Sequence, residues 1–337
     1  MLAIMLRELG GPEQLRLETV PDPVPGPGEV LVRLKAAALN RRDAWARVGQ
    51  YPGIKLPAIP GSDGAGEVAA LGAGVEGLAV GQAVVINPAL KWGDNPRFYG
   101  PDYSILGIPT NGTFAQFVVV PAENVLPKPA YLSWEEAAAL PLAGLTAYRA
   151  LFTRGRLAAG ETVFIPGVGG GVATVALQMA VAAGARVYVS SSSDAKLERA
   201  RALGAAGGVN YRTDTQWART LRNETGGVDL SVDSVGGSTF NDLIYLAKPG
   251  SRIVTFGATA GPVRELVMPR LFFKQLDVLG STMGSPDDFR NMLAFCEAHR
   301  LRPVVDRVFP LAEAGPAEQY MEEGHQFGKI VLAIPEA

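Results

Sequence analysis

A glycine-rich segment in the middle of the chain has the residue types needed to hold a nucleotide pyrophosphate. In "ETVFIPGVGGGVATVALQ", a β-branched run at 162–165 precedes a cluster of glycines, and a helical pattern follows. Glycines permit a tight turn, and the N–H groups at the start of a helix attract an anion. Ala173 keeps the small side chain that lets helix and strand pack closely. The expected contacts are Gly167, Val168, Gly169, Gly170, Gly171 and Val172, although an ordinary strand, turn and helix would show the same pattern.

Two stricter matches to the dinucleotide fingerprint G-x-G-x-x-G/A lie in "IPGSDGAGEVAALGAGVEG". One falls at Gly64, Gly66 and Ala69, and the other at Gly72, Gly74 and Gly77. The fingerprint requires a helix directly after the glycine turn. Here "LAVGQAVVI" follows, in which a glycine and β-branched residues disfavour a helix. We interpret both matches as turns between strands.

The end of the next strand indicates which nicotinamide cofactor is used. Enzymes that use NAD usually place an acidic residue there to bind the ribose 2′-hydroxyl. In "VYVSSSSDAK" no carboxylate precedes Asp194, while Ser190, Ser192 and Lys196 offer hydroxyl groups and a positive charge for a 2′-phosphate. Tyr211, at the next strand end, would support them. The serines also suit capping of the following helix; both roles are compatible with the predicted cofactor, NADPH.

The elements around these residues predict an α/β protein with two domains. The 337-residue chain exceeds the usual size of one core. Its first part is rich in proline, glycine and short β-branched runs, which is typical of a compact barrel-like β domain. Strands and helices then alternate, which predicts a doubly wound parallel sheet. We place the first domain at 1–128 and 299–337, because the tail returns to a strand pattern, and the second at 129–298.

Composition excludes several other classes of protein. A net charge of −2 provides no field that would attract nucleic acid or an anionic membrane surface. No stretch reaches the roughly 20 apolar residues of a membrane-spanning helix, and the apolar run at the N-terminus is shorter than we expect of a signal peptide. The single cysteine, Cys296, excludes an intrachain disulfide; these features favour a cytoplasmic protein. Cys296 and His299 have the spacing of a metal-ligand pair, but we interpret them as the last turn of an amphipathic helix.

The chain resembles the medium-chain dehydrogenase/reductase superfamily over nearly its whole length. The matching stretches are "PGPGEVLVRLKAAALNRRD", "PAIPGSDGAGEV", "GTFAQFVVVPAENVLPKP", "AAALPLAGLTAYRAL", "GVGGGVA", "KLERARALGA", "GSRIVTFG" and "FGKIVL". The resemblance implies a GroES-like catalytic domain joined to a Rossmann domain, with the active site in the cleft. It also implies a homodimer or homotetramer built through the Rossmann edge near "LVMPRLFFKQLDVLG".

The residues at the family's zinc positions imply a zinc-free member that resembles quinone oxidoreductases and zeta-crystallin. Zinc enzymes look like "GxCHTD" where this chain has "ALNRRD", and like "PGHE" where it has "PGSD". Asn40 and Ser62 therefore stand in place of a cysteine and a histidine ligand, and the third position falls near Leu142. The segment 87–107, which corresponds to the lobe with four cysteines around a structural zinc, contains none.

The expected chemistry is reduction of a substrate that is already electrophilic. Zinc would polarise a carbonyl by several kcal/mol. Without it, hydride transfer from NADPH to a quinone or an α,β-unsaturated carbonyl compound remains accessible, because the product anion is delocalised. The alternatives are a zinc-type alcohol dehydrogenase and a non-catalytic NADPH-binding protein.

The resemblance also assigns individual residues. It puts Asn40 near the nicotinamide ribose or the substrate oxygen, Tyr51 in the role of proton donor, and Ser62 as a hydrogen-bond donor. Asn40 would equally cap a helix, and Tyr51 would equally pack. Asp43 is expected to orient its neighbours by pairing with Arg41 or Arg42, and Trp92 to line the pocket. Further expected cofactor contacts are Thr146, Val235, Phe256, Gly257, Ala258, Ser281 and Thr282, with Lys329 neutralising phosphate.

Overall fold

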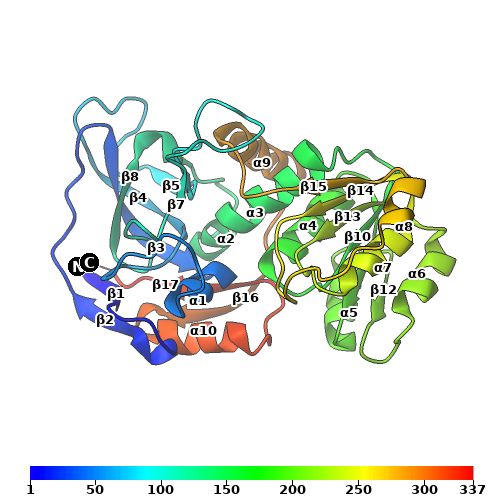
Figure 1. Ribbon diagram of the computed structural model, residues 1–337. Coiled ribbons are helices and arrows are strands. Elements are labelled where there is room, and N and C mark those ends of the chain that lie inside the picture. Colours follow the sequence, from blue (N-terminus) through cyan, green and yellow to red (C-terminus); the bar gives the residue numbers. More distant parts are fainter. Residues whose placement is uncertain (337) are drawn as a thin grey trace. The chain divides into compact units, whose positions relative to one another are not determined.

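A computed structural model describes residues 1–336, which divide into two compact units (Figure 1). Unit 1 comprises Met1–Ala143 and Ser285–Ala337, and unit 2 comprises Gly144–Gly284. The α/β fold class predicted from the sequence is confirmed. Among the described residues, no helix combines the length and the apolar character needed to cross a membrane.

The unit boundaries differ from the changes of pattern at 128 and 298. Helix α2 (Trp134–Ala139) packs against strands β3 (Glu29–Ala38) and β4 (Asp63–Leu71) of unit 1. The hydroxyl group of Tyr131 donates to the carbonyl oxygen of Cys296 at 2.8 Å, which joins the start of this region to helix α9 (Pro286–His299). Helical periodicity marks where helices occur, but their packing partner decides the unit to which they belong.

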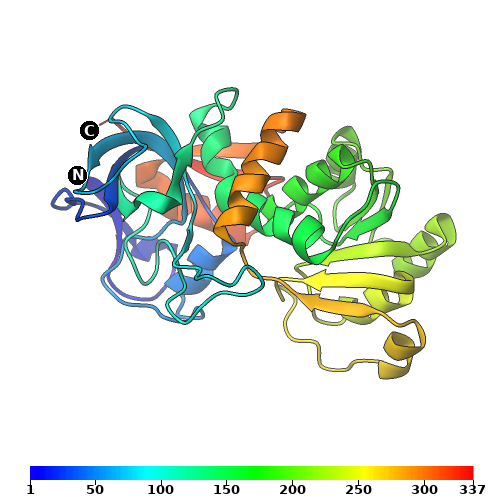
Figure 2. The same ribbon diagram turned by 90° about the horizontal axis from the view of Figure 1, so that it is seen from above.

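Unit 2 contains a parallel six-stranded sheet in the order β12-β11-β10-β13-β14-β15. Figure 2 shows β14 and β15 side by side at its yellow and orange end. Three strands on each side of the switch point between β10 and β13 give the doubly wound order expected of a Rossmann domain. The strands are β10 (Thr162–Ile165), β11 (Arg186–Ser191), β12 (Gly207–Asn210), β13 (Val228–Asp233), β14 (Ala247–Thr255) and β15 (Asp277–Gly280). The helices are α4 (Gly171–Ala182), α5 (Asp194–Ala202), α6 (Trp217–Thr225), α7 (Thr239–Leu246) and α8 (Met268–Phe273).

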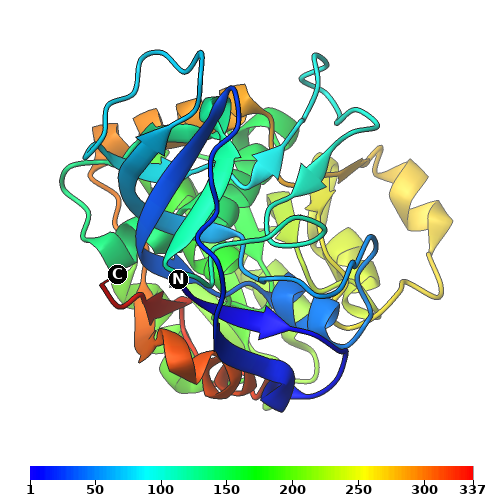
Figure 3. The same cartoon turned by 90° about the vertical axis from the view of Figure 1, so that its left-hand side faces the viewer.

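Unit 1 contains a seven-stranded sheet in which the C-terminal tail pairs with the N-terminal part. Strand β17 (Lys329–Ala333) runs antiparallel to β3, with Val331 opposite Ala38. Figure 3 shows these red and blue segments together. The other strands of unit 1, inside and outside this sheet, are β1 (Leu2–Leu6), β2 (Leu15–Thr19), β5 (Ala83–Ile86), β6 (Ala89–Leu90), β7 (Ser104–Ile105), β8 (Phe117–Pro121), β9 (Val125–Pro127) and β16 (Val305–Pro310). The remaining helices are α1 (Arg41–Arg47), α3 (Pro141–Tyr148), which continues into unit 2, and α10 (Ala314–Glu322).

The two strict glycine fingerprints lie in unit 1 and have no helix after them. We expected the first match to be a turn, and this is wrong because it lies inside strand β4. A Cβ atom at Gly66 would lie 2.1 Å from the carbonyl oxygen of Arg33 on the neighbouring strand, so close approach of two backbones explains the glycine. The second match, Gly72 to Gly77, follows β4 as a loop, with positive φ at Gly74 and Gly77.

An ion pair from the end of α1 anchors this helix in unit 1. The Arg47 guanidinium is buried and donates to Glu318 and Glu322 of α10, at 2.7 Å each. It also donates to the carbonyl oxygen of Gly10 at 2.5 Å. Helix α1 follows directly after β3, and the residues expected to be catalytic lie around its first turn.

Candidate active site

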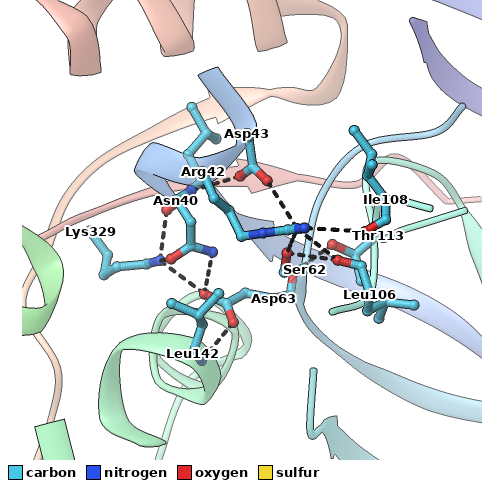
Figure 4. A network of polar contacts seen from close by, with 11 residues as sticks. Asn40, Arg42, Asp43, Ser62, Asp63, Leu106, Ile108, Thr113, Leu142 and Lys329 are labelled. Atoms are coloured by element: carbon cyan, nitrogen blue, oxygen red, sulfur yellow. Dashed lines mark hydrogen bonds and ion pairs between the residues drawn. The ribbon is translucent and has the colours of Figure 1, made fainter. Parts of the chain in front are cut away.

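Asn40 is the N-cap residue of α1, and its side chain points into a buried polar network (Figure 4). Its backbone N–H donates to the Asp43 carboxylate at 2.8 Å, which fixes the first turn of the helix. Its amide nitrogen donates to the Asp63 carboxylate at 2.9 Å, and its amide oxygen accepts from Lys329 at 2.7 Å. Asn40 therefore combines the capping position with contacts to two charged groups.

Lys329 and Asp63 form the ionic centre of this network. The Lys329 ammonium group donates to Asp63 at 2.9 Å, to the Asn40 side chain, and to the carbonyl oxygen of Leu39 at 2.6 Å. The second Asp63 oxygen accepts from the backbone N–H of Leu142 at 2.7 Å. An ammonium group has three N–H bonds. To contact a phosphate, Lys329 would have to give up one of its three hydrogen bonds, so its expected phosphate role stays a prediction.

Arg42 fills the adjacent space with a second cation. Its Nη1 donates to Ser62 Oγ at 2.6 Å and to the carbonyl oxygen of Leu106 at 3.0 Å, and its Nη2 donates to the carbonyl oxygen of Ile108 at 3.3 Å. The guanidinium carbon lies 4.7 Å from the centre of the half-buried Tyr51 ring. This geometry is a cation–π contact. Arg42, rather than Arg41, is therefore the arginine beside Asp43, with 3.9 Å between Nη1 and Oδ1.

The hydroxyl group of Ser62 makes two hydrogen bonds within unit 1. Its hydroxyl group accepts from Arg42 and donates to the carbonyl oxygen of Leu106 at 2.8 Å. A serine has a single O–H donor. A backbone carbonyl accepts from that donor, so Ser62 anchors Arg42 here, and its expected role as a hydrogen-bond donor into the metal position stays a prediction.

The side chains at the family's zinc positions do not form a zinc donor set. Zinc sites use thiolate, imidazole or carboxylate ligands. Asn40 and Ser62 use their polar atoms within the protein network, and Leu142 offers only a hydrocarbon side chain. Within residues 1–336, no cluster of three or more His, Cys, Asp or Glu residues has a metal-binding arrangement. Cys296 is buried with its sulfur 3.8 Å from the sulfur of Met292, and the His299 ring packs on Phe295.

The glycine turn of unit 2 lies between β10 and α4, as predicted. Gly167 and Gly169 have φ values of 68° and 141°, which favour glycine. The backbone N–H of Val168 donates to the carbonyl oxygen of Ser190 at 2.7 Å, and that of Gly167 donates to Ser190 Oγ at 3.2 Å. Gly170 is the N-cap residue of α4. Ser190 thus supports the turn, and its expected contact with the cofactor stays a prediction.

The other expected cofactor residues of unit 2 follow the carboxyl ends of parallel strands, which is the ligand-binding edge of such sheets. Thr146 is an exception: it lies in α3, with its hydroxyl 3.9 Å from the sulfur of Met283. The strand-end residues are Ser192 and Lys196 after β11, Tyr211 after β12, Val235 after β13, Phe256, Gly257 and Ala258 after β14, and Ser281 and Thr282 after β15.

Sequence reasoning considered Arg42 only as a partner of Asp43, and it assigned no role to Asp63 or Asp233. Asp63 and Arg42 form the polar network, whereas Asp233 supports a loop by accepting from the Val235 N–H at 2.8 Å. Burial raises the pKa of Asp233. Charged residues next to apolar strand ends were the available signal. Trp92, expected to line a pocket, packs edge-on against Tyr99 and Tyr103, with ring centres 6.0 and 5.5 Å away.

The parallel sheet of unit 2, with a glycine turn between β10 and α4, has the arrangement of a dinucleotide-binding domain. A family model described as "Zinc-binding dehydrogenase" matches residues 171–298, and "Alcohol dehydrogenase GroES-like domain" matches residues 26–130. The chain belongs to the medium-chain dehydrogenase/reductase superfamily.

Similar proteins carry several descriptions. A zinc-type alcohol dehydrogenase-like protein of Leptosphaeria maculans is 39% identical over 95% of this chain and 94% of its own. A crystal structure of an NAD-dependent alcohol dehydrogenase has 43% identity and a TM-score of 0.95, covering 99% of this chain and 100% of its own. A crotonyl-CoA carboxylase/reductase in complex with NADP has 28% identity and a TM-score of 0.90, covering 99% and 94%.

Asp43 is expected to make stability depend on pH. Burial raises the pKa of its carboxyl group to about 6, against the opposing effects of Arg42 and the Asn40 N–H bond. A raised pKa in the folded state means that its contribution to stability is present below pH 4 and is lost as pH rises through about 6.

We therefore predict that Asp43→Asn removes this dependence. Between about pH 4 and pH 7, the wild type should lose about 3 kcal/mol of unfolding free energy relative to the variant, measured by urea unfolding. Asp102→Asn, at an exposed position, is the control and should run parallel to the wild type. Parallel curves for wild type and Asp43→Asn would contradict the prediction.

Proposed function

We propose that this protein is an NADPH-dependent, zinc-independent reductase of quinones or α,β-unsaturated carbonyl compounds. The observation that carries the proposal is the buried network of Asn40, Arg42, Asp63 and Lys329. In it two side-chain cations contact Asn40 and Ser62, the residues that the resemblance puts at zinc-ligand positions. Fixed cations and hydrogen-bond donors can stabilise negative charge on a substrate oxygen. They do not form the thiolate and imidazole donor set on which zinc-dependent alcohol oxidation relies.

The glycine turn fits a dinucleotide. Gly170 has a φ of −75°, which any residue can adopt, and a Cβ atom built on it meets no protein atom within 4 Å. No intramolecular contact therefore explains a glycine here, while a closely approaching pyrophosphate would. Bound NADPH would supply the hydride.

The end of β11 supports NADPH over NADH. Asp194, the first carboxylate after the strand, accepts from the Asn210 side chain at 2.8 Å. Ser193 Oγ accepts from the Lys196 N–H and caps α5. Ser192 and the charged end of Lys196 are the groups we assign to the 2′-phosphate. The NADP-bound crotonyl-CoA relative favours this assignment, whereas the printed description of the NAD-dependent relative favours the alternative.

In the proposed reaction, the chain orients the substrate and supplies a proton. A conjugated carbonyl or quinone accepts hydride at carbon, and negative charge develops on its oxygen. Asn40 and its neighbours provide a fixed polar environment for that charge. Tyr51, whose ring covers Arg42, is the residue we assign as proton donor.

We also propose that the protein forms a homo-oligomer through the β15 edge of unit 2. Strand β15 ends the sheet order, so its outer edge pairs with no strand within residues 1–336. Large apolar side chains near it are exposed, including Phe272, Phe273 and Val278. A second copy of the same edge would pair the strand and cover these side chains.

The glycine turn gives the first test of this function. Gly170→Val should weaken NADPH binding at least tenfold, because the new side chain occupies the space assigned to the pyrophosphate. Fluorescence titration with NADPH measures the Kd. Ala182→Val, at the other end of α4, adds similar bulk and should bind normally. Equal Kd values for Gly170→Val and wild type, with thermal unfolding unchanged, would refute the nucleotide assignment.

The second test compares substrates and metal content. Purified protein should oxidise NADPH with 1,4-benzoquinone or 2-cyclohexenone, and dialysis against EDTA should leave that rate unchanged. Stoichiometric zinc by mass spectrometry, together with loss of activity on chelation, would instead indicate a zinc-type alcohol dehydrogenase. Tight NADPH binding without oxidation by any acceptor would indicate a non-catalytic protein.

The third test concerns assembly. Phe273→Asp should lower the mass measured by light scattering, because a buried charge opposes association across the β15 edge. Phe98→Asp, at an exposed position in unit 1, is the matched control and should keep the wild-type mass. A monomeric wild type would refute the proposed assembly.

A further inference from the structure

The Arg42 side chain has one buried donor, Nε, without a partner among the described residues. A guanidinium group has five N–H donors. Three hydrogen bonds hold Nη1 and Nη2 to Ser62, Leu106 and Ile108. Nε is buried and makes no hydrogen bond within the described chain. In a guanidinium group the Nε–H and one N–H of Nη2 are parallel, and together they form the fork that recognises oxygen atoms.

This fork is rigidly placed. Only 7% of the Arg42 residue is exposed, and its bound N–H groups use two backbone carbonyls as fixed acceptors. The Tyr51 ring covers one face of the guanidinium. A buried N–H without a partner costs free energy comparable to that of a lost hydrogen bond. The unpartnered Nε–H lies next to Asn40 and Ser62, and a ligand that accepts a hydrogen bond from it would remove this free-energy cost.

The surrounding charges leave the guanidinium available to an anionic oxygen. The charged groups of this network are Asp43, 3.9 Å from Arg42 Nη1, and Asp63, which is already paired with Lys329. Among the described residues, these two carboxylates accept hydrogen bonds from Asn40, Leu142 and Lys329, and not from Arg42. All three hydrogen bonds of the Arg42 guanidinium therefore go to neutral oxygens.

We propose that Arg42 is a catalytic residue that binds the carbonyl oxygen of the substrate through Nε and Nη2. This inference rests on the proposed function. When hydride from NADPH adds to the carbon β to the carbonyl group, the C=C electron pair shifts and forms an enolate, whose oxygen accepts both N–H bonds. A proton then adds to the α carbon, and the product carries one new C–H bond at each carbon. Arg42 remains protonated throughout.

Kinetics of Arg42 variants test this role. Arg42→Met should lower kcat and kcat/KM together, by about 10²–10³-fold, because the contact strengthens as charge develops on the oxygen. Arg42→Lys keeps the charge but loses the fork, and should fall between that variant and wild type. Arg16→Met, on an exposed strand position, is the matched control and should leave the rate unchanged. A KM increase with kcat unchanged would overturn the proposal, because it would indicate ground-state anchoring only.

A second readout needs no turnover. 4-Nitrophenol mimics an enolate, and its ionised form absorbs visible light. Wild-type protein should lower the pKa of bound 4-nitrophenol, seen as the phenolate band at a pH where free 4-nitrophenol is neutral. Arg42→Met should abolish the band, and Arg16→Met should retain it. Absence of a bound phenolate in the wild type would overturn the proposal.

The two readouts separate failure of this inference from failure of the proposed function. If no enone or quinone oxidises NADPH but wild-type protein binds phenolate through Arg42, the proposed function fails while the oxyanion site stands. If turnover occurs and Arg42→Met keeps kcat within twofold, the function stands and the inference fails. Should Arg42→Met not fold, Ser62→Ala removes one anchor of Nη1 and should reduce both kcat and the phenolate band; unchanged values would overturn the proposal.

Discussion

The buried ammonium–carboxylate contact between Lys329 and Asp63 is the interaction on which unit 1 depends most. It joins the start of β17 to the start of β4, and through Asn40 it also holds the first residue before α1. Each charge loses its hydration on burial, so only complete partnering makes the arrangement tolerable. The three donors of Lys329 and the acceptors of Asp63 meet that condition, and this fixes the helix that carries Arg42.

Unit 2 positions its candidate site with neutral groups. The glycine turn is held by the backbone and hydroxyl oxygens of Ser190 on the neighbouring strand, and its conformation is permitted by glycine at 167 and 169. Both candidate sites are thus held by an element next to them in space rather than by their own segment. Removing one hydrogen-bond partner would cost more free energy in unit 1 than in unit 2, because an unpartnered ion costs more than an unpartnered hydroxyl group.

The sequence predicted what local pattern determines. Strand, glycine turn and helix at 162–182 are consecutive, so their order alone indicates a Rossmann unit. The polar network escaped prediction because Asp63 and Lys329 lie far apart in the chain and meet only through the pairing of β17, β3 and β4. Gly66 was assigned to a turn for the same reason. The backbone of β3 requires a glycine there, and the residues that flank Gly66 in the sequence do not indicate this.

The side chains of the four serines at 190–193 make different contacts. Ser190 holds the turn, Ser191 Oγ accepts from the Ser193 N–H at 3.3 Å, and Ser193 caps α5. The polar side chain of Ser192 makes no hydrogen bond among those that support the fold in this segment. Under the proposed assignment of Ser192 to the 2′-phosphate, a substitution at this one position would change the cofactor contact and leave the hydrogen bonds of the strand, the turn and the helix in place.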